Sequence, residues 1–291
     1  MTVAENKVQK RLPEWLQRNV LLNTNSRNVY SLIQEFNLNT VCQSARCPNR
    51  NECFSNSTAT FMILGDTCTR GCTFCSVPKG KPVNLPDPKE PVNVAKAAKT
   101  LNLKHVVITS VDRDDLDDQG SSHFANTIIE LKKEIENVII EVLTPDFRGN
   151  KDCIKRVTDA LPDIYNHNLE TVPRLYKKVR PGAIYSQSLE LIKFVKESNP
   201  NIITKSGIML GLGEETSEVV DVIKDLFNYK CDYLTLGQYM QPTRNSISVY
   251  RYLYPEEFNE LKLIAQKIGF KKVFSGPLVR SSYHAGELHK N

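Results

Sequence analysis

The sequence contains no apolar run as long as a membrane-spanning helix requires. The first twenty residues, MTVAENKVQKRLPEWLQRNV, have no apolar core of the kind found in secretory signal peptides, and Glu5 and Glu14 argue against a mitochondrial presequence. Internal repeats and low-complexity segments are also absent from the sequence. We therefore expect a cytoplasmic protein with no attachment to a membrane, in a compartment that keeps thiols reduced.

Neither sign of charge is in large excess. Lys and Arg number 38 and Asp and Glu 33, which leaves a net charge of +5. This balance does not indicate nucleic acid as a partner, although it allows a weakly cationic face toward an acidic protein. The 40% of apolar and 24% of charged residues are typical of a globular protein, and 291 residues suffice for one α/β barrel.

From Thr60 onward, apolar segments of strand length alternate with amphipathic helical segments. The predicted strands are TFMIL, HVVITSV, NVIIEVLTPDF, DIYNHNLET, ITKSGIMLGLG and YLTLGQYM. Helical spacing is found in SRNVYSLIQEFNL, SSHFANTIIELKKEIE, SLELIKFVKESN and SEVVDVIKDLFNY. This alternation predicts parallel βαβ units, and six of them favour a partial (β/α)6 barrel, with a doubly wound open sheet as the alternative. We expect an N-terminal extension (1–58), a barrel core (59–270) and a C-terminal extension (271–291).

Polar residues follow the predicted strands. They are Ser110 and Asp112, Thr144 and Asp146, Asn168 and Glu170, and Gln238. In a barrel these positions lie at the carboxyl ends of the strands, where active sites are built. Any one of them is explained as a helix cap, but a set on successive strands favours a site.

Cysteines are concentrated in two groups. Cys68, Cys72 and Cys75 follow the first strand within eight residues, and Cys42, Cys47 and Cys53 precede it with gaps of four and five residues. Structural zinc takes four ligands, usually from two close pairs, and neither group supplies them. Three cysteines on a four-iron cluster leave one iron open for a small molecule. Cys153 and Cys231 stand alone, and we assign them no chemistry.

The triplet, with Phe74 before its last cysteine, resembles the motif of the radical S-adenosylmethionine enzymes. Over nearly the whole chain, the sequence is similar to the lipoyl synthase family. The matching segments include LPEWL, CQSARCPN, FMILGDTCTRGCTFC, VITSVDRDDL, NHNLETVPRLY, KSGIMLGLGE, GQYMQPT and VRSSYHAG.

This resemblance implies two 4Fe–4S clusters. Cys68, Cys72 and Cys75 would hold the cluster that binds S-adenosylmethionine. Cys42, Cys47, Cys53 and a serine of Arg280–Tyr283, for which we choose Ser282 over Ser281, would hold an auxiliary cluster. Because a hard alkoxide suits this iron poorly, the serine corner should be the one most easily lost. Contacts to S-adenosylmethionine are implied for Phe74, Ser110, Asp112, Asn168, Glu170 and Arg180.

The reaction implied is the insertion of two sulfur atoms, at C6 and C8, into an octanoyl-lysine of a lipoyl-carrier protein, with the auxiliary cluster as sulfur donor. Implied partners are that carrier, an electron donor such as flavodoxin or ferredoxin, and an iron–sulfur carrier that restores the consumed cluster. Two alternatives remain at this point: another radical enzyme with an auxiliary cluster, and a non-enzymatic iron–sulfur or metal-binding protein. The latter would not need polar residues at the end of each strand.

Overall fold

The computed structural model describes residues 12–17, 24–56 and 59–282. Its centre is one sheet in which the strands lie side by side in chain order, β1 to β8. The strands are β1 (Asn39–Thr40), β2 (Thr60–Ile63), β3 (His105–Ser110), β4 (Ile139–Leu143), β5 (Ile164–Asn166), β6 (Ile203–Leu210), β7 (Tyr233–Gln238) and β8 (Lys272–Gly276). β1 runs antiparallel to β2, and every later neighbour pair is parallel.

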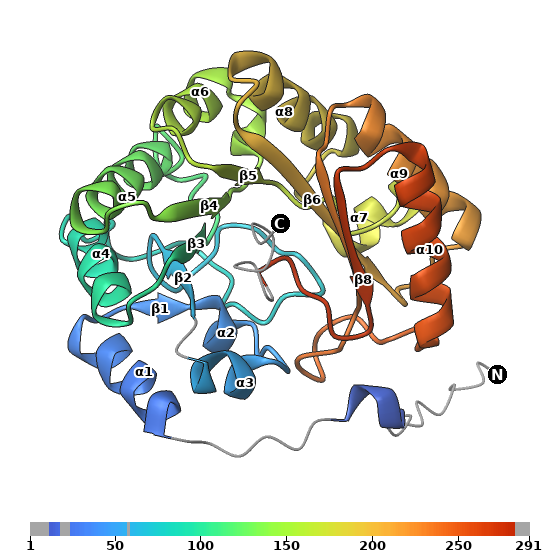
Figure 1. Ribbon diagram of the computed structural model, residues 1–291, viewed down its shortest axis with the longest axis horizontal. Coiled ribbons are helices and arrows are strands. Elements are labelled where there is room, and N and C mark those ends of the chain that lie inside the picture. Colours follow the sequence, from blue (N-terminus) through green and yellow to red (C-terminus); the bar gives the residue numbers. More distant parts are fainter. Residues whose placement is uncertain (1–11, 18–23, 57–58, 283–291) are drawn as a thin grey trace.

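Helices surround this sheet on its outer face (Figure 1). The helices that connect successive strands are α4 (Glu90–Thr100), α5 (Ser121–Glu134), α6 (Lys151–Asp159), α8 (Tyr185–Ser198), α9 (Thr216–Asn228) and α10 (Pro255–Ile268). α1 (Thr24–Glu35), α2 (Val41–Ser44) and α3 (Arg50–Ser55) gather beside β1. Short turns of helix complete the fold: η1 (Glu14–Leu16), η2 (Phe147–Gly149), η3 (Pro173–Leu175) and α7 (Tyr176–Val179).

Strand residues alternate between the helix layer and the barrel interior. Val106 and Ile108 of β3, and Ile140 and Val142 of β4, are fully buried in the main core beneath the helices. Their neighbours face inward, because successive side chains of a strand point to opposite faces. A small separate cluster of Val107, Ile164 and Tyr233 therefore fills part of the interior. The inward positions nearer the carboxyl ends are more polar, and these carry the site.

The prediction of a partial α/β barrel is confirmed. The six predicted strands correspond to β2 through β7, and the helices predicted in 26–38, 121–136, 188–199 and 217–229 correspond to α1, α5, α8 and α9. Two strands were not predicted, β1 and β8. β8 pairs with β7 and lies within residues 271–291, so part of the segment that we set apart as an extension belongs to the sheet.

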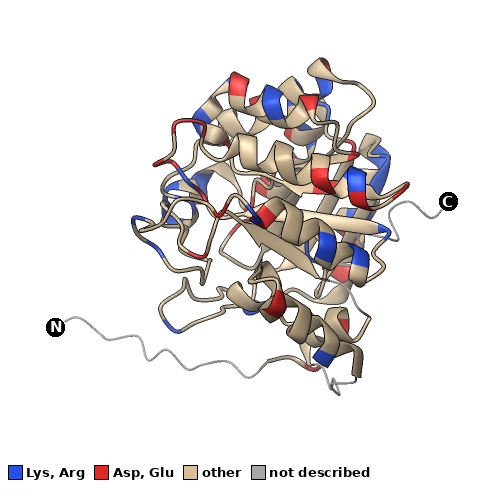
Figure 2. Cartoon of the chain, turned by 90° about the vertical axis from the view of Figure 1, so that its left-hand side faces the viewer, with Lys and Arg blue, Asp and Glu red and all other residues tan. Residues whose placement is uncertain are grey.

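The sheet curves into a ring that stays open between its first and last strands. No pairing joins β1 to β8 in the part of the chain that the structure describes. After β8 the chain turns into the middle of the ring, beside the loop that follows β2 (Figure 1). On the outside, Lys and Arg are interspersed with Asp and Glu along the helices (Figure 2). One such pair links α4 to α5, with Lys99 Nζ 2.9 Å from Glu134 Oε2.

Candidate active site and cofactor site

The cysteine triplet lies on the loop that follows β2. The loop is anchored by its backbone: Thr69 N donates to Asp112 O at the end of β3, and Thr73 N donates to Val179 O at the end of α7. A further pair of backbone bonds, Cys68 N to Pro78 O and Gly80 N to Cys68 O, closes the loop on itself. The three thiols are partly buried and form no disulfide. The loop therefore holds three free thiols at the carboxyl-end face of the barrel.

Burial keeps these thiols protonated in the cluster-free protein. It raises the pKa of Cys72 to about 11 from an ordinary value of 9.0. For Cys68, burial first and the nearby Asp112 carboxylate second raise the pKa to about 12. Burial also raises the pKa of Cys75. Because iron binds thiolates, binding of iron by these three cysteines would release protons.

A first cavity, of about 180 Å³, lies directly over the triplet. It is lined by all three cysteines and by all six residues predicted to contact S-adenosylmethionine, namely Phe74, Ser110, Asp112, Asn168, Glu170 and Arg180. These residues come from the triplet loop, from the ends of β3 and β5, and from the turn after α7. The structure thus brings together a set that the sequence spreads over more than a hundred positions.

Three buried polar atoms of this lining have no hydrogen-bond partner among the described residues. They are Ser110 Oγ, Asn168 Oδ1 and Arg180 Nε. Buried polar atoms are nearly always paired, and unpaired ones in a cavity indicate a bound molecule that would satisfy them. A ligand with hydroxyl, amino and carboxylate groups, as S-adenosylmethionine has, fits this lining.

Arg180 and Glu170 provide opposite charges at this cavity. Arg180 Nη1 donates to the carbonyl oxygen of Asn168 at 2.9 Å, and the guanidinium also lies over the ring of Tyr176. Glu170 has a left-handed backbone (φ 67°) and is held by β6, because its N–H donates to Gly207 O. Burial raises the pKa of Glu170 although Arg180 opposes this effect. Strained backbone of this kind is concentrated at functional sites.

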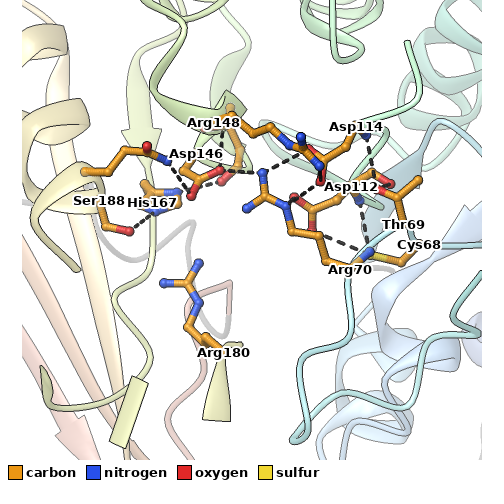
Figure 3. A network of polar contacts seen from close by, with 12 residues as sticks. Cys68, Thr69, Arg70, Asp112, Asp114, Asp146, Arg148, His167, Arg180 and Ser188 are labelled. Atoms are coloured by element: carbon orange, nitrogen blue, oxygen red, sulfur yellow. Dashed lines mark hydrogen bonds and ion pairs between the residues drawn. The ribbon is translucent and has the colours of Figure 1, made fainter. Parts of the chain in front are cut away.

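Arg70, between the first two cysteines of the triplet, was missed by the sequence analysis. Its guanidinium contacts Asp112, Asp114 and Asp146, with nitrogen–oxygen distances of 3.3, 2.8 and 2.6 Å (Figure 3). Burial alone would lower the pKa of Arg70, but these carboxylates raise it. In the sequence, only its position inside the triplet pointed to Arg70, because its carboxylate partners follow two other strands, β3 and β4.

His167 was also missed, and it supports the same region from behind. Its Nδ1 lies 2.9 Å from Thr144 O and its Nε2 3.0 Å from Ser188 Oγ, so both ring nitrogens have partners (Figure 3). Burial, followed by the charge of Arg180, lowers the pKa of His167 to about 4. The ring is therefore neutral at physiological pH and serves as a rigid connection.

A second cavity, of about 230 Å³, adjoins the other cysteine group. Cys42, at the start of α2, and Cys47 line it together with Ser281 and Ser282. Cys53, on α3, is not part of this lining; it packs against the apolar cluster formed with α1. Burial, and then the proximity of Cys47, raises the pKa of Cys42 to about 11. The structure thus brings Cys42, Cys47 and the serine pair to one cavity although they are far apart in sequence.

The two serines are bound differently. Ser281 Oγ accepts a hydrogen bond from Asn168 Nδ2 at 2.7 Å, and the Ser281 carbonyl accepts one from Lys205 Nζ at 2.6 Å. The hydroxyl of Ser281 is thus already used inside the barrel. Ser282 follows it and lines the same cavity as Cys42 and Cys47.

The two cavities share part of their walls. Val41, Phe74, Cys75, Leu143, Asn168 and Glu170 line both of them. The cavity that holds Cys42 and Cys47 therefore adjoins the one that holds the triplet, and Cys75 lines both. In the described residues, no three His, Cys, Asp or Glu side chains are grouped as tightly as the ligands of a single metal ion. The ligands of a four-iron cluster bind separate corners and lie further apart.

Comparison with known proteins identifies relatives of this chain. The model of the radical SAM superfamily matches residues 62–226, and that of the N-terminal domain of lipoyl synthase of the radical SAM family matches residues 1–47. The lipoyl synthase of Caldanaerobacter subterraneus subsp. tengcongensis is 56% identical over 94% of this chain and 96% of its own length. That of Wigglesworthia glossinidia brevipalpis is 53% identical over 97% of this chain and 89% of its own length.

Solved structures show the same fold at low identity. Methylornithine synthase (PylB) has a TM-score of 0.52 at 14% identity and covers 95% of this chain and 90% of its own. Streptococcus suis SuiB bound to S-adenosylmethionine has a TM-score of 0.59 at 13% identity, covering 80% and 54%. In the part of the chain that the structure describes, no helix is long and apolar enough to cross a membrane. With more than half of its residues shared along nearly its full length, the chain belongs to the lipoyl synthase family of radical SAM enzymes.

Proposed function

We propose that this chain inserts sulfur at C6 and C8 of a protein-bound octanoyl-lysine, and that its two cysteine groups hold the two 4Fe–4S clusters of that reaction. The observation that carries the proposal is the shared wall of the two cavities, because a carbon that loses hydrogen at one site must meet sulfur at the other. When bound, the cluster with S-adenosylmethionine supplies one-electron chemistry that removes hydrogen from an unactivated carbon, and the auxiliary cluster supplies sulfur.

In the first cavity, Cys68, Cys72 and Cys75 would ligate three corners of one cluster. The buried cation of Arg180 suits the carboxylate of S-adenosylmethionine, and Asp112 and Glu170 suit its amino and hydroxyl groups. The unpartnered atoms of Ser110, Asn168 and Arg180 support these roles. Phe74 supplies an apolar surface beside the triplet for the adenine ring.

At the second cavity, Cys42, Cys47, Cys53 and Ser282 would ligate the auxiliary cluster. Cys42 and Cys47 already share the cavity with Ser282, and Cys53 lies on the next helix along the chain. A serine oxygen binds iron of a sulfide cluster less well than a thiolate does, which would make its corner the easiest to open. This residue choice accounts for a cluster that is consumed as a reagent.

An octanoyl chain requires an apolar path. The lining of the second cavity includes Ile208, Met209, Tyr239 and Met240, and Leu143 belongs to the wall that the two cavities share. Thioether side chains of Met adapt to flexible apolar ligands. We place the acyl chain along these residues, between the two cysteine groups.

We further propose a division of the chain into an auxiliary-cluster segment (1–58), a barrel core (59–270) and a C-terminal segment (271–291) whose strand β8 completes the barrel sheet. The substrate is an octanoylated lipoyl-carrier protein or domain, and a reductant must supply electrons. Flavodoxin or ferredoxin is the proposed donor, and an iron–sulfur carrier protein would rebuild the auxiliary cluster. Because the six cysteines act as thiolates, we place the protein in the reducing cytoplasm, acting on neither nucleic acid nor membrane.

An anaerobic single-turnover assay tests the proposal. The protein reconstituted with both clusters is mixed with S-adenosylmethionine, a strong reductant and an octanoyl-lysine peptide, and the peptide is weighed by mass spectrometry. A gain of two sulfur atoms together with 5′-deoxyadenosine is the expected result. 5′-Deoxyadenosine without sulfur on the peptide would indicate a different substrate. Neither product, from protein with full iron content, would favour an iron–sulfur carrier.

A further inference from the structure

A lysine lies fully buried inside the barrel. Lys205, on β6, has a relative exposure of 0%. Its Nζ lies 2.8 Å from Oε1 of Glu141, on β4, and donates a 2.6 Å hydrogen bond to the carbonyl oxygen of Ser281. Lys205 is therefore an ion-pair partner of one strand and an anchor for the segment that follows β8.

The ion pair itself is well supported. Asn166 Nδ2 donates to Glu141 Oε1 at 3.2 Å, and His105 Nε2 lies 3.3 Å from Glu141 Oε2. Burial alone would raise the pKa of Glu141, but Lys205 and His105 hold it below its ordinary value. A buried ion pair adds little to stability compared with apolar residues of the same size. Its presence in this interior points to a role other than core stability.

Several independent contacts hold the chain just before Ser282. Asn49 Nδ2, between Cys47 and Cys53, donates to Leu278 O at 2.7 Å. Asn168 Nδ2 donates to Ser281 Oγ at 2.7 Å, beside the bond from Lys205 to the same residue. The segment Leu278–Ser281 is thus tied to the auxiliary cysteines at one end and to the barrel interior at the other.

Two glycines leave room for this segment. A Cβ on Gly237 of β7 would collide with the carbonyl oxygen of Val279. A Cβ on Gly207 of β6 would lie 2.6 Å from Thr235 Oγ1 and 3.1 Å from Ser281 Oγ. A larger residue at Gly237 would displace the segment itself, whereas one at Gly207 would first displace Thr235 and Asn168, the side chain that donates to Ser281. The interior is therefore shaped around these C-terminal residues.

We propose that Lys205, oriented by Glu141, is a positioning residue that holds the Leu278–Ser281 segment in a channel left open by Gly207 and Gly237 and so presents Ser282 to the auxiliary cluster. This inference rests on the proposed role of Ser282 as a ligand. Lys205 touches neither proposed cluster ligand nor substrate; it acts through the backbone of the residue next to Ser282.

Hydrogen–deuterium exchange of the anaerobically reconstituted protein tests this anchor. The variant Lys205→Met/Glu141→Gln removes both charges, so that neither is left buried without a partner, and Gln can still accept from Asn166. We expect exchange of the peptide covering 277–282 to become about tenfold faster while the rest of the barrel keeps its protection. Lys196→Met is the matched control, because it breaks the Lys196–Asp232 ion pair outside the barrel interior, and 277–282 should exchange as in the wild type.

Gly237→Ala provides a second variant that leaves the charges intact. It should speed exchange of the peptide 277–282, because the added methyl group obstructs the channel at Val279. If the double variant does not fold, this variant tests the proposal instead. Unchanged exchange of 277–282 in the folded variants would overturn the proposal. Faster exchange throughout the barrel would do so as well, because it would assign Lys205 to general stability.

Ser282→Ala separates the anchor from the proposed ligand. It should alter the Mössbauer spectrum of the auxiliary cluster while 277–282 stays protected, whereas the Lys205 variant should alter both. If Ser282→Ala leaves the spectrum unchanged, Ser282 is not the ligand and that part of the proposed function fails. The exchange result still decides whether Lys205 is an anchor.

Discussion

Arg70, within the cysteine triplet, places its Nη2 2.6 Å from Oδ1 of Asp146, just beyond the end of β4. Asp146 is in turn held by Gln187 Nε2 at 2.9 Å. The loop that carries the three thiols is therefore fixed to a strand other than the two it connects. A loop that must hold a cluster at a set distance from a bound molecule needs such a fixed point.

Replacement of Arg70 by Gln should loosen this loop. Asp114 and Asp146 would lose their buried cationic partner, at a cost of about 3 kcal/mol in the free energy of unfolding. We expect a lower iron content at the triplet and slower formation of 5′-deoxyadenosine, measured in protein whose Cys42, Cys47 and Cys53 are replaced by Ala. Arg148→Gln is the control, because that side chain is 66% exposed and its contact with Asp114 should be worth less than about 1 kcal/mol. Equal losses in the two variants would contradict this account.

Ser282 and Ser281 should respond differently to substitution. Ser282→Cys offers a softer ligand, so the auxiliary cluster should persist, while sulfur insertion falls at least about tenfold because its weak corner is gone. 5′-Deoxyadenosine should still form. Ser281→Ala loses the hydrogen bond from Asn168, worth about 1 kcal/mol, and should keep measurable sulfur insertion. Mass spectrometry of the octanoyl peptide measures both; full sulfur insertion by Ser282→Cys would argue against the ligand assignment.

Because His167 is buried as a neutral imidazole, we expect the folded protein to lose stability in mild acid. Its pKa is about 4 in the folded protein against an ordinary value of 6.5, so the unfolded chain binds the proton more tightly. The contribution of His167 to the free energy of unfolding is about 3 kcal/mol in total. It is fully present above pH 6.5 and is lost as the pH falls toward 4. Urea unfolding of the cluster-free protein between pH 7 and pH 4.5 measures the slope. His167→Gln should flatten it; an equally steep slope in that variant would assign the effect to other groups.

The thiols of the triplet should react slowly while they are free of iron. With pKa values of about 12 for Cys68 and about 11 for Cys72, their thiolate fraction at pH 8 is about a hundredfold or more below that of an ordinary thiol. Alkylation by iodoacetamide, followed by mass spectrometry, should therefore be far slower than in a peptide of residues 66–78 and should accelerate as the pH rises. Alkylation at the peptide's rate at pH 8 would show that burial does not protect these thiols.

Local sequence patterns predicted much of the fold. Apolar runs flanked by turns located β2 through β7, and the triplet located the loop after β2. β8 escaped because only Val273 and Phe274 of its five residues are apolar, and β1 because it has two residues. Both segments are strands because they pair with a neighbouring strand, β8 with β7 and β1 with β2.

The charged groups inside the barrel were beyond local patterns for a similar reason. Lys205 is the one charged residue of β6, but its partners Glu141 and Ser281 lie 64 and 76 positions away. Likewise nothing near Arg70 in the sequence indicates Asp146. Contacts of this kind depend on which strands become neighbours in the sheet. The sequence of a single segment does not predict that order.

The contact between Asn49 and Leu278 spans 229 positions of the chain, whereas the triplet spans a single short loop. Closing so long a stretch costs more chain entropy than closing the short triplet loop. The two proposed cluster sites thus differ in how much of the chain must be ordered to form them. A partly folded chain already carries every thiol for the first cluster, but the meeting of Cys42 and Cys47 with Ser282 awaits the completed barrel. The triplet can therefore gather its thiols locally, whereas the proposed auxiliary-cluster site depends on contacts that span most of the chain.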